Sequence, residues 1–313
     1  MAFTDRLQSR DVIPLIINAL DAPPAPWFGD LTNKVTSDKD SEVYTWLGSA
    51  PKMTPWKGGR KPATLGKNEF RIPNLEFEAS LEIPTLWLRR DHTGQIRLKI
   101  AELGESAADH KFDLISATID SAGSTVCYDG QYFFDTDHQE GESPVQSNIK
   151  SVDIGTPTAP TAAELESSIL SGIEAMYGIV DDKGRKTNGS AKRFGVMVPL
   201  NYMRALGTAL KADVLIEGGA ARSSNMRAVG SLMGLSIEGI VNPRLSWTDK
   251  FAIFRMDGAV KPFVWQVEQD PVTSVLAEGS DEEVKNKRWL FAIDASYNTG
   301  LNQWRGAMQV QHT

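Results

Sequence analysis

The sequence has few of the residues that most often carry chemistry, since its 313 residues include one cysteine and four histidines. A single cysteine excludes a disulfide within the chain and fits assembly in a reducing cytoplasm. Acidic residues outnumber basic ones by 40 to 33, so the formal net charge is −7 and no basic excess is available to grip nucleic acid. No stretch of the sequence approaches the roughly 20 apolar residues that a membrane span requires.

Sequence motifs for binding phosphate, dinucleotides and calcium all fail on spacing. The two glycines of Gly59–Gly66 are too far apart for a phosphate-binding loop, and Asn68 stands where Ser or Thr would bind magnesium. Gly218–Arg222 lacks the glycine spacing of a dinucleotide site and is expected to be a flexible loop. A calcium loop counted from Asp135 would need glycine where Glu140 stands. We therefore predict no cofactor and no metal ligand.

The segment Cys127–His138 is the most informative part of the chain. It holds the cysteine, three aspartates and a histidine, with His110 a short distance before it. One interpretation is a thiol- or metal-dependent hydrolase, which needs an acidified thiol, a base within reach and a third orienting group. The other is a buried structural cysteine beside a tight turn at Asp129-Gly130. Because the sequence shows none of the catalytic requirements, we favour the structural interpretation and predict no catalytic residue.

Residues Leu75–Ile83 alternate apolar side chains with acidic or hydroxyl ones, which predicts a half-buried strand about 30 Å long. Together with Glu69–Ile72 this strand indicates a long β-arm that projects from the body of the protein. The alternative is an edge hairpin folded back on its own domain. The pattern alone does not separate the two.

Two helices are predicted from periodicity and capping. Residues 94–122 place apolar side chains at steps of three and four, which predicts an amphipathic helix, with close packing or a slight bend at Gly104. Thr161 and Glu164 form a capping box that opens a second helix, ending at Gly178. Further strands are expected at 194–198, 236–241, 251–255, 263–267 and 289–295, and further helices after Pro199 and at 229–234.

The first 48 residues read as an arm. Val12–Leu20 is apolar enough for a short helix, and the prolines of Ala22–Trp27 require an extended segment after it. Trp27, Phe28 and Leu31 continue the apolar character, which indicates an arm laid across a neighbouring subunit.

Specific residues between about 40 and 140 resemble the major head subunit of Mu-like tailed phages. The matching pieces are Tyr44–Gly48, Pro51, Trp56, the Phe70 and Phe77 strand region, Glu102–His110, Cys127–Gln131 and Phe133–His138. Beyond Pro157 the resemblance rests on element order and on short pieces such as Val196–Pro199 and Asn242-Pro243.

This resemblance implies an α+β fold of the Hong Kong 97 type, with an N-terminal arm, an extended hairpin called the E-loop, a peripheral domain with a long spine helix, and an axial domain. The corresponding boundaries are 1–48 for the arm, 49–90 for the E-loop, 91–150 with 255–313 for the peripheral domain (spine helix about 94–122), and 151–254 for the axial domain. It further implies hexamers and pentamers that close an icosahedral shell around double-stranded DNA, without sequence-specific DNA binding.

The resemblance also implies partners and a location. The arm begins close to Met1 without a charged helical prefix, so a separate scaffolding or protease protein is expected, with a portal and decoration proteins as further partners. The place is the virion capsid, assembled in the bacterial cytoplasm, with no membrane partner. We predict no covalent cross-link. The candidate contacts between subunits are aromatic residues, which concentrate interface energy: Trp27, Phe28, Trp46, Trp56, Phe70 and Phe77.

Two rivals stay open. One is a shell of the same fold that encloses protein cargo, an encapsulin-like nanocompartment. The other is the hydrolase built on Cys127–His138.

Overall fold

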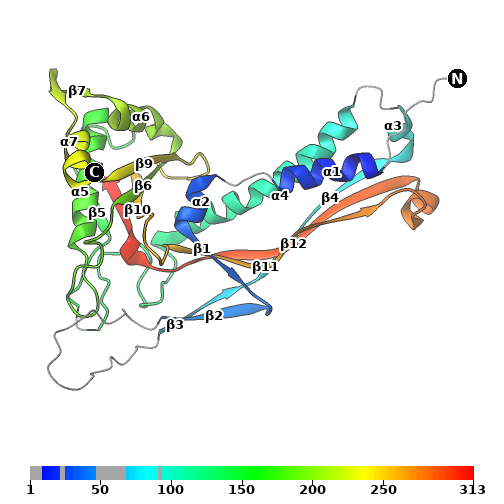
Figure 1. The fold of residues 1–313 in the computed structure, drawn as a ribbon, viewed down its shortest axis with the longest axis horizontal. Coiled ribbons are helices and arrows are strands. Elements are labelled where there is room, and N and C mark those ends of the chain that lie inside the picture. The colour runs from blue at the N-terminus through cyan, green and yellow to red at the C-terminus, as the bar shows by residue number, and fades with distance from the viewer. Residues whose placement is uncertain (1–8, 22–24, 47–67, 91–93, 142) are drawn as a thin grey trace.

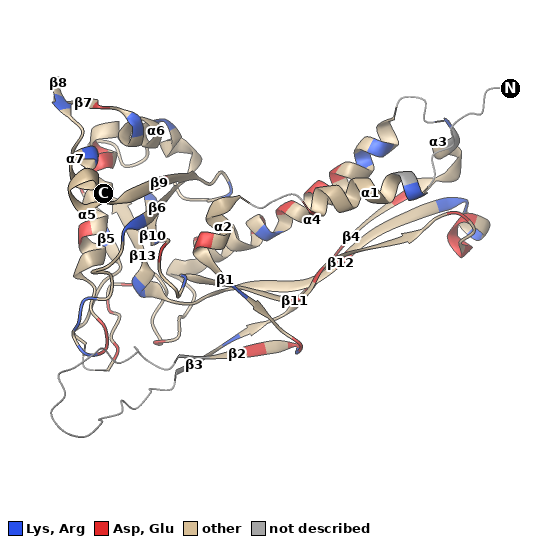
Figure 2. Cartoon of the chain, in the orientation of Figure 1, with Lys and Arg blue, Asp and Glu red and all other residues tan. Residues whose placement is uncertain are grey.

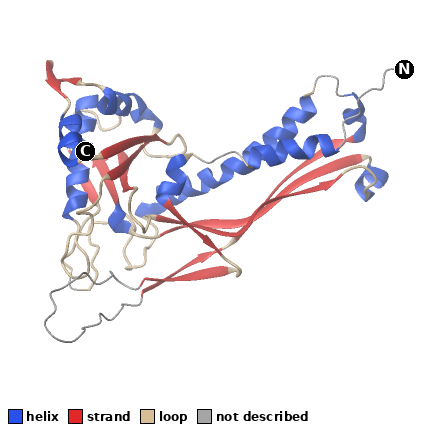
Figure 3. Cartoon of the chain, in the orientation of Figure 1, coloured by secondary structure: helices blue, strands red, loops and turns tan. Residues whose placement is uncertain are grey.

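A long helix, α4 (Gln95–Asp120), runs along most of the narrower part of this elongated molecule (Figure 1). The computed structural model describes residues 9–21, 25–46, 68–90, 94–141 and 143–313. In the described residues, α4 packs across a four-stranded sheet, and the two form the narrower part of the molecule. A compact group of helices around a second sheet forms the other end (Figure 3). Among the described residues no helix is both long and apolar enough to cross a bilayer.

The four-stranded sheet extends the length of the narrower part. Its order is β1 (Thr32–Thr36), β11 (Phe263–Leu276), β12 (Arg288–Leu301) and β4 (Leu75–Pro84). The β1–β11 pair is parallel and the other pairs are antiparallel. The β11–β12 ladder is irregular at two places, between Val267 and Gln269 and between Gln269 and Val272. Beyond this sheet lie the short helix α3 (Thr85–Arg90) and a π-helical turn, η3 (Glu282–Asn286).

The compact module is built on a five-stranded sheet. The strand order is β5 (Ile149–Val152), β13 (Ala307–His312), β10 (Lys250–Arg255), β6 (Arg193–Val198) and β9 (Ser236–Val241). Helices α5 (Ala162–Gly178), α6 (Met203–Lys211) and α7 (Asn225–Met233) pack around it, and the hairpin β7 (Val214–Glu217) and β8 (Ala220–Ser223) projects from the same end. Three short 3₁₀ turns complete the module and its connections: η1 (Ser121–Gly123), η2 (Leu200–Tyr202) and η4 (Trp304–Gly306).

Several predicted elements are confirmed. The helix predicted at 94–122 is α4, and the helix opened by the capping box is α5, in which Thr161 and Glu164 bond reciprocally. The alternation of Leu75–Ile83 is confirmed in β4 from Glu76 onward, where Ile83 is buried and the glutamates are exposed, but Leu75 is 43% exposed. The five strands predicted downstream are β6, β9, β10, β11 and β12, although β11 and β12 each run to 14 residues.

Strand β4 settles the question that its pattern left open. It pairs along its whole length with β12, from Pro84 opposite Arg288 to Leu75 opposite Tyr297, and is the edge strand of its own sheet. The prediction that this strand forms a projecting arm is therefore wrong. The hairpin that does project is β2 (Ser41–Trp46) paired with β3 (Asn68–Pro73).

The N-terminal segment also differs from its prediction. Helix α1 (Ser9–Leu20) packs on α4 of the same chain, with Val12 and Ile16 fully buried. Helix α2 (Pro26–Leu31) likewise buries Phe28 and Leu31 against its own chain. The prediction that these residues lie across a neighbouring subunit is wrong, because α4 and the sheet supply the apolar surface that covers them.

The C-terminus and the 218–222 segment are two further corrections. Strand β13 pairs with β10 and β5, so the last residues belong to the compact module and do not return to the long sheet. Gly218 and Gly219, with positive φ angles of 57° and 82°, make the tight turn of the β7–β8 hairpin where a flexible loop was expected.

Close packing at Gly104 allows α1 to lie against α4. A Cβ atom at this position would stand 2.9 Å from the Ala19 Cβ and 3.1 Å from the Ile16 backbone. Glycine is thus required here by the neighbouring helix, which confirms the expectation of close packing at this site. Gly207 in α6 differs, because nothing lies within 4 Å of its Cβ position.

Replacing Gly104 by Ala is expected to lower the free energy of unfolding by about 1–3 kcal/mol, since the added methyl group over-packs the α1–α4 contact. The matched control Gly207→Ala adds the same group in open space and should be neutral or stabilising by up to about 1 kcal/mol. Urea unfolding of the two purified variants measures both effects. Equal stability of the two variants would contradict the packing argument.

Candidate functional site

The Cys127–His138 segment folds into a tight loop beside the start of β5. The Cys127 N–H donates to the Gln131 carbonyl at 2.7 Å, and the Gly130 N–H donates to the Cys127 carbonyl at 3.1 Å. Gly130 has a φ of 87°, so the turn expected at Asp129-Gly130 is confirmed. Hydrogen bonds between backbone groups therefore hold the loop in addition to the side-chain contacts described below.

Cys127 lacks the surroundings of a nucleophile. Its side chain is buried, and its Sγ atom donates to the Asn302 carbonyl at 3.4 Å. Burial, with a further contribution from the Asp129 carboxylate, raises the pKa of the thiol far above its usual value, whereas catalysis needs it lowered. His110 lies on α4, where its Nδ1 is 2.9 Å from the Tyr297 hydroxyl. The structure therefore does not bring His110 to the cysteine.

His138 is engaged on both ring nitrogens. Its Nδ1 lies 2.6 Å from Asp129 Oδ2, and its Nε2 lies 3.3 Å from Asn148 Oδ1. The Asn148 amide is oriented by a 2.7 Å bond that it donates to the Phe133 carbonyl. The imidazole stacks on Trp304 with ring centroids 3.9 Å apart. His138 therefore fastens the loop, and its partners exclude a role as base for Cys127.

A second buried network ties this loop to the C-terminal turn η4. Glu140 and Arg305 form an ion pair whose side chains are 6% and 4% exposed. The Tyr128 hydroxyl and the Trp304 Nε1–H, the latter at 3.2 Å, also donate to Glu140. Burial raises the pKa of Tyr128 well above its usual value, so the hydroxyl stays a donor. Glu140 is thus a structural carboxylate, which sequence reasoning tested only as a calcium ligand.

Asp135 holds the backbone of the segment, whereas Asp129 bonds to His138. Asp135 accepts hydrogen bonds from the N–H groups of Tyr132 at 3.1 Å and Thr136 at 2.7 Å. Within the residues that the structure describes, no three His, Cys, Asp or Glu side chains come together as metal ligands would. The arrangement supports a locked loop and gives the hydrolase interpretation no geometry.

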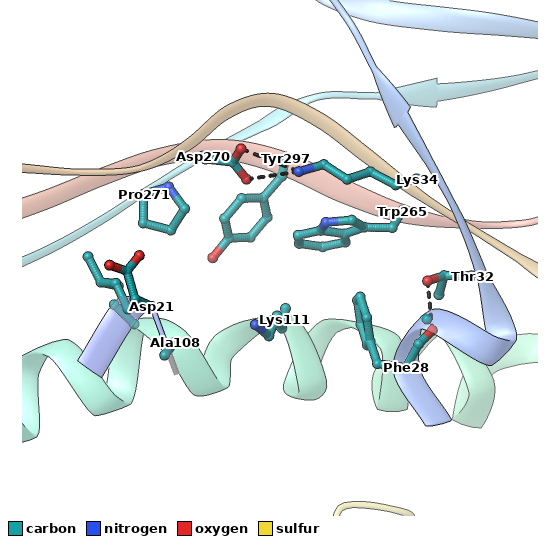
Figure 4. A pocket seen from close by; sticks show the side chains of 13 residues that line it. Asp21, Phe28, Thr32, Lys34, Ala108, Lys111, Trp265, Asp270, Pro271 and Tyr297 are labelled. Carbon is teal, nitrogen blue, oxygen red and sulfur yellow. Dashed lines mark hydrogen bonds and ion pairs between the residues drawn. The ribbon is translucent and has the colours of Figure 1, made fainter. Parts of the chain in front are cut away.

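A cavity of about 590 Å³ lies between α4 and the long sheet (Figure 4). Trp265 and Tyr297 form its aromatic wall, and Lys34 pairs with Asp270 at 3.3 Å across its rim. Burial lowers the pKa of Lys111, which also lines it. Burial raises the pKa of Tyr297 to about 12. These groups can hold a ring or a charged group, but they do not form a nucleophile with an adjacent base.

The aromatic residues that were predicted to contact neighbouring subunits differ in how far they are buried. Phe28 is buried against Phe112 and Trp265, with ring centroids 5.5 Å away in each case, so it is not available to a neighbour. Trp27 is half-buried beside Phe112. The side chain of Trp46 and all of Trp56 lie outside the described residues.

Phe70 and Phe77 are both half-buried. On the β2–β3 hairpin, Phe70 stacks on Tyr44 at 5.1 Å. On β4, Phe77 packs edge-on against His110, with the two ring centroids 4.4 Å apart. Sequence reasoning did not select Trp87 of α3, whose side chain is 62% exposed. A large aromatic this exposed is typical of an interaction surface.

Comparison with solved structures identifies the class. The capsid protein of cyanophage P-SCSP1u matches with a TM-score of 0.59 at 14% identity, covering 100% of this chain and 92% of that one. The virus-like particle from Pyrococcus furiosus matches with a TM-score of 0.55 at 11% identity, covering 97% of this chain and 99% of that one. The fold is thus the α+β fold of Hong Kong 97-type phage capsid proteins, as the sequence resemblance implied.

Within this class, residues 18–159 match the family described as Mu-like prophage major head subunit gpT. The FluMu major head subunit of Haemophilus influenzae is 34% identical over 125 residues, which are 40% of this chain and 41% of the relative. The major capsid protein of Escherichia phage Mu is 30% identical over 154 residues, 49% and 47% of the two chains. The matches span less than half the length of these relatives. The resemblance to the Mu-like major head subunit is confirmed over this region.

Alkylation tests whether Cys127 is reactive. Because burial raises the thiol pKa, we expect iodoacetamide at pH 7.5 to label the folded protein slowly and the urea-unfolded protein fast, as followed by intact mass. Cys127→Ser should keep the fold. Rapid labelling of the folded chain would support the hydrolase rival.

The Glu140–Arg305 pair can be tested by a double-mutant cycle. Arg305→Met leaves the Glu140 charge buried and should cost about 3–5 kcal/mol of unfolding free energy. Adding Glu140→Gln removes that charge and should recover part of the loss. The exposed Lys285–Asp281 pair, 2.6 Å apart, supplies the control, since Lys285→Met should change stability little. Additive losses in the cycle would contradict a coupled pair.

Proposed function

We propose that this chain is the major capsid subunit of a Mu-like tailed phage, which self-assembles as hexamers and pentamers into an icosahedral head around double-stranded DNA. The observation that carries the proposal is the coincidence of two independent matches. The family match over residues 18–159 is specific in sequence, and the capsid fold extends over the whole chain. The virion is the corresponding location, with assembly in the bacterial cytoplasm.

The parts of the chain take the following roles in this proposal. The β2–β3 hairpin with the segment between its strands is the E-loop, α4 is the spine helix, and α4 with the long sheet forms the peripheral domain. The compact module is the axial domain, and it includes β5 and β13 in addition to 151–254. Strand pairing supports these domain boundaries instead of the boundaries expected from the sequence, because β13 completes the sheet of the compact module.

The charge distribution supports loose enclosure of DNA. Basic and acidic side chains are interspersed on both parts of the molecule (Figure 2). Many basic groups are neutralised by ion pairs within the chain; Arg193, for example, contacts both Asp30 and Glu238. A chain with a net charge of −7 has no basic excess to grip a polyanion, which favours release of an enclosed genome.

The partners of the proposed subunit are copies of itself, a scaffolding or protease protein, a portal, and decoration proteins. A cargo-enclosing nanocompartment is the second candidate, favoured by the structural likeness to the archaeal virus-like particle. Its fold and self-association would be the same. The enclosed material separates the two candidates.

Expression of the chain with its genomic neighbours, followed by negative-stain microscopy, tests the proposal. We expect closed shells whose interior protects double-stranded DNA from nuclease. Particles that hold protein cargo and no DNA would favour the nanocompartment, and lone molecules at high concentration would overturn both candidates.

Trp56→Ala tests the E-loop as a clamp between subunits. We expect folded, soluble protein with a reduced yield of particles, because an aromatic anchor is removed from the interface. Val145→Ala, at a 59% exposed site in a loop of the compact end, is the control and should leave the yield unchanged. A normal yield from the tryptophan variant would count against the clamp.

A further inference from the structure

The cavity between α4 and the long sheet lies where the sheet is irregular (Figure 4). In the β11–β12 ladder, Asp270 and Pro271 together stand opposite the single residue Ala295. A bulge of this kind redirects the side chains around it. On the facing side, α4 presents Ala107 and Ala108, whose methyl groups are too short to fill the space. The resulting cavity of about 590 Å³ has the size of a small-molecule site.

The aromatic wall of this cavity is held in a fixed position. The rings of Trp265 and Tyr297 lie with their centroids 4.7 Å apart, and Phe28 packs edge-on against Trp265. The Tyr297 hydroxyl is 2.9 Å from the His110 Nδ1 on α4. Burial raises the pKa of Tyr297 to about 12, so its hydroxyl keeps its proton. A wall of fixed rings is suited to a planar aromatic ligand, which can stack on it or meet it edge-on.

Half-buried Lys111 supplies the cavity with an amine (Figure 4). Within the described residues its ammonium group forms no ion pair, whereas Lys34 pairs with Asp270 at 3.3 Å. Burial lowers the pKa of Lys111; Lys34 adds to this effect, and Asp109 and Asp270 oppose it. A lowered pKa increases the fraction of neutral amine, which is the nucleophilic form of lysine. Lys111 therefore needs no adjacent base to act as a nucleophile.

We propose that Lys111 is a covalent modification site for a planar aromatic aldehyde, whose ring lies against Trp265 and Tyr297. The Lys111 Nζ forms a bond to the carbonyl carbon and gives a carbinolamine. The carbonyl oxygen then leaves as water with the two hydrogens of the amine, and an imine remains. This step consumes no oxidant or reductant, and it modifies each chain once.

The lining charges favour an uncharged ring. Two ammonium groups and two carboxylates line the cavity: Lys34, Lys111, Asp21 and Asp270. Because these charges balance, the cavity offers no excess of either sign to a charged substituent. The proposal is independent of the proposed function, since it concerns the interior of one chain.

Reductive labelling of the purified full chain with benzaldehyde is the principal test. Cyanoborohydride reduces the imine to a stable amine, and peptide mass mapping then gives the labelling rate of each lysine. We expect Lys111 to react about tenfold faster than Lys34, which lies in the same cavity but is paired. It should exceed the exposed Lys285 by a similar factor. In urea the three rates should become similar. Similar rates in the folded chain would overturn the proposal.

A second aldehyde and a cavity-filling variant test the role of the ring. Acetaldehyde has no ring to place against Trp265, so its preference for Lys111 over Lys34 should be several-fold smaller. Ala108→Phe fills the cavity and should reduce the benzaldehyde rate at Lys111 to that of Lys34. Equal urea midpoints of this variant and the wild type check that it is folded. The acetaldehyde comparison uses the wild-type chain, and equal preference with both aldehydes would overturn the proposal.

Stability gives a readout that reactivity alone would not change. A ring that fills the cavity contacts α4 and the sheet at once, so the labelled wild type should unfold at a higher urea concentration than the unlabelled chain. Lys111→Arg keeps the charge but forms no imine, and benzaldehyde should leave its urea midpoint unchanged. A lower midpoint for the labelled wild type would show that the ring does not fit the cavity and would overturn the proposal.

Discussion

The antiparallel pairing of β11 with β12 is the contact on which the rest of the molecule depends. These 14-residue strands run the length of the narrower part, and β1 and β4 add to their outer edges. Helix α4 can lie flat only because this sheet gives it an extended apolar floor, to which β12 contributes Phe291, Ile293 and Tyr297. From the end of β12 the chain passes through η4 directly into β13, so the same strand connects the long part to the compact module.

The Cys127–His138 loop and the residues that follow it up to β5 have a structural role in this arrangement. Through Glu140 and Arg305, and through His138 stacked on Trp304, it holds η4 at the point where β12 gives way to β13. Residues that looked like catalytic candidates thus secure the junction between the two parts. His138 and Glu140 lie in the segment that the head-subunit family matches, and buried, hydrogen-bonded polar groups of this kind favour one rigid arrangement.

Periodicity and capping motifs predicted the helices and strands whose sequence signals come from residues close together in the chain. The α4 periodicity, the Thr161–Glu164 capping box and the β4 alternation each arise from side chains a few residues apart, and all three are confirmed. Strands β1 and β13 were missed, because short strands in buried or parallel positions lack clear alternation. Partners distant in sequence, such as Arg305 for Glu140, carry no local signal. Trp87 lies in an apolar run that looks buried, so its exposure could be seen only in the folded chain.

The two irregularities in the β11–β12 ladder fall between two separate hydrophobic clusters, one centred on the compact module and one near Trp289. Bulges interrupt the regular hydrogen bonding, bend the strand and increase the local twist of the sheet. Helix α4 spans this point without a break, since Ile100 packs in one cluster and Ile115 and Ile119 in the other. The two ends of the chain therefore have separate cores that are joined by one helix and by an irregular part of the sheet.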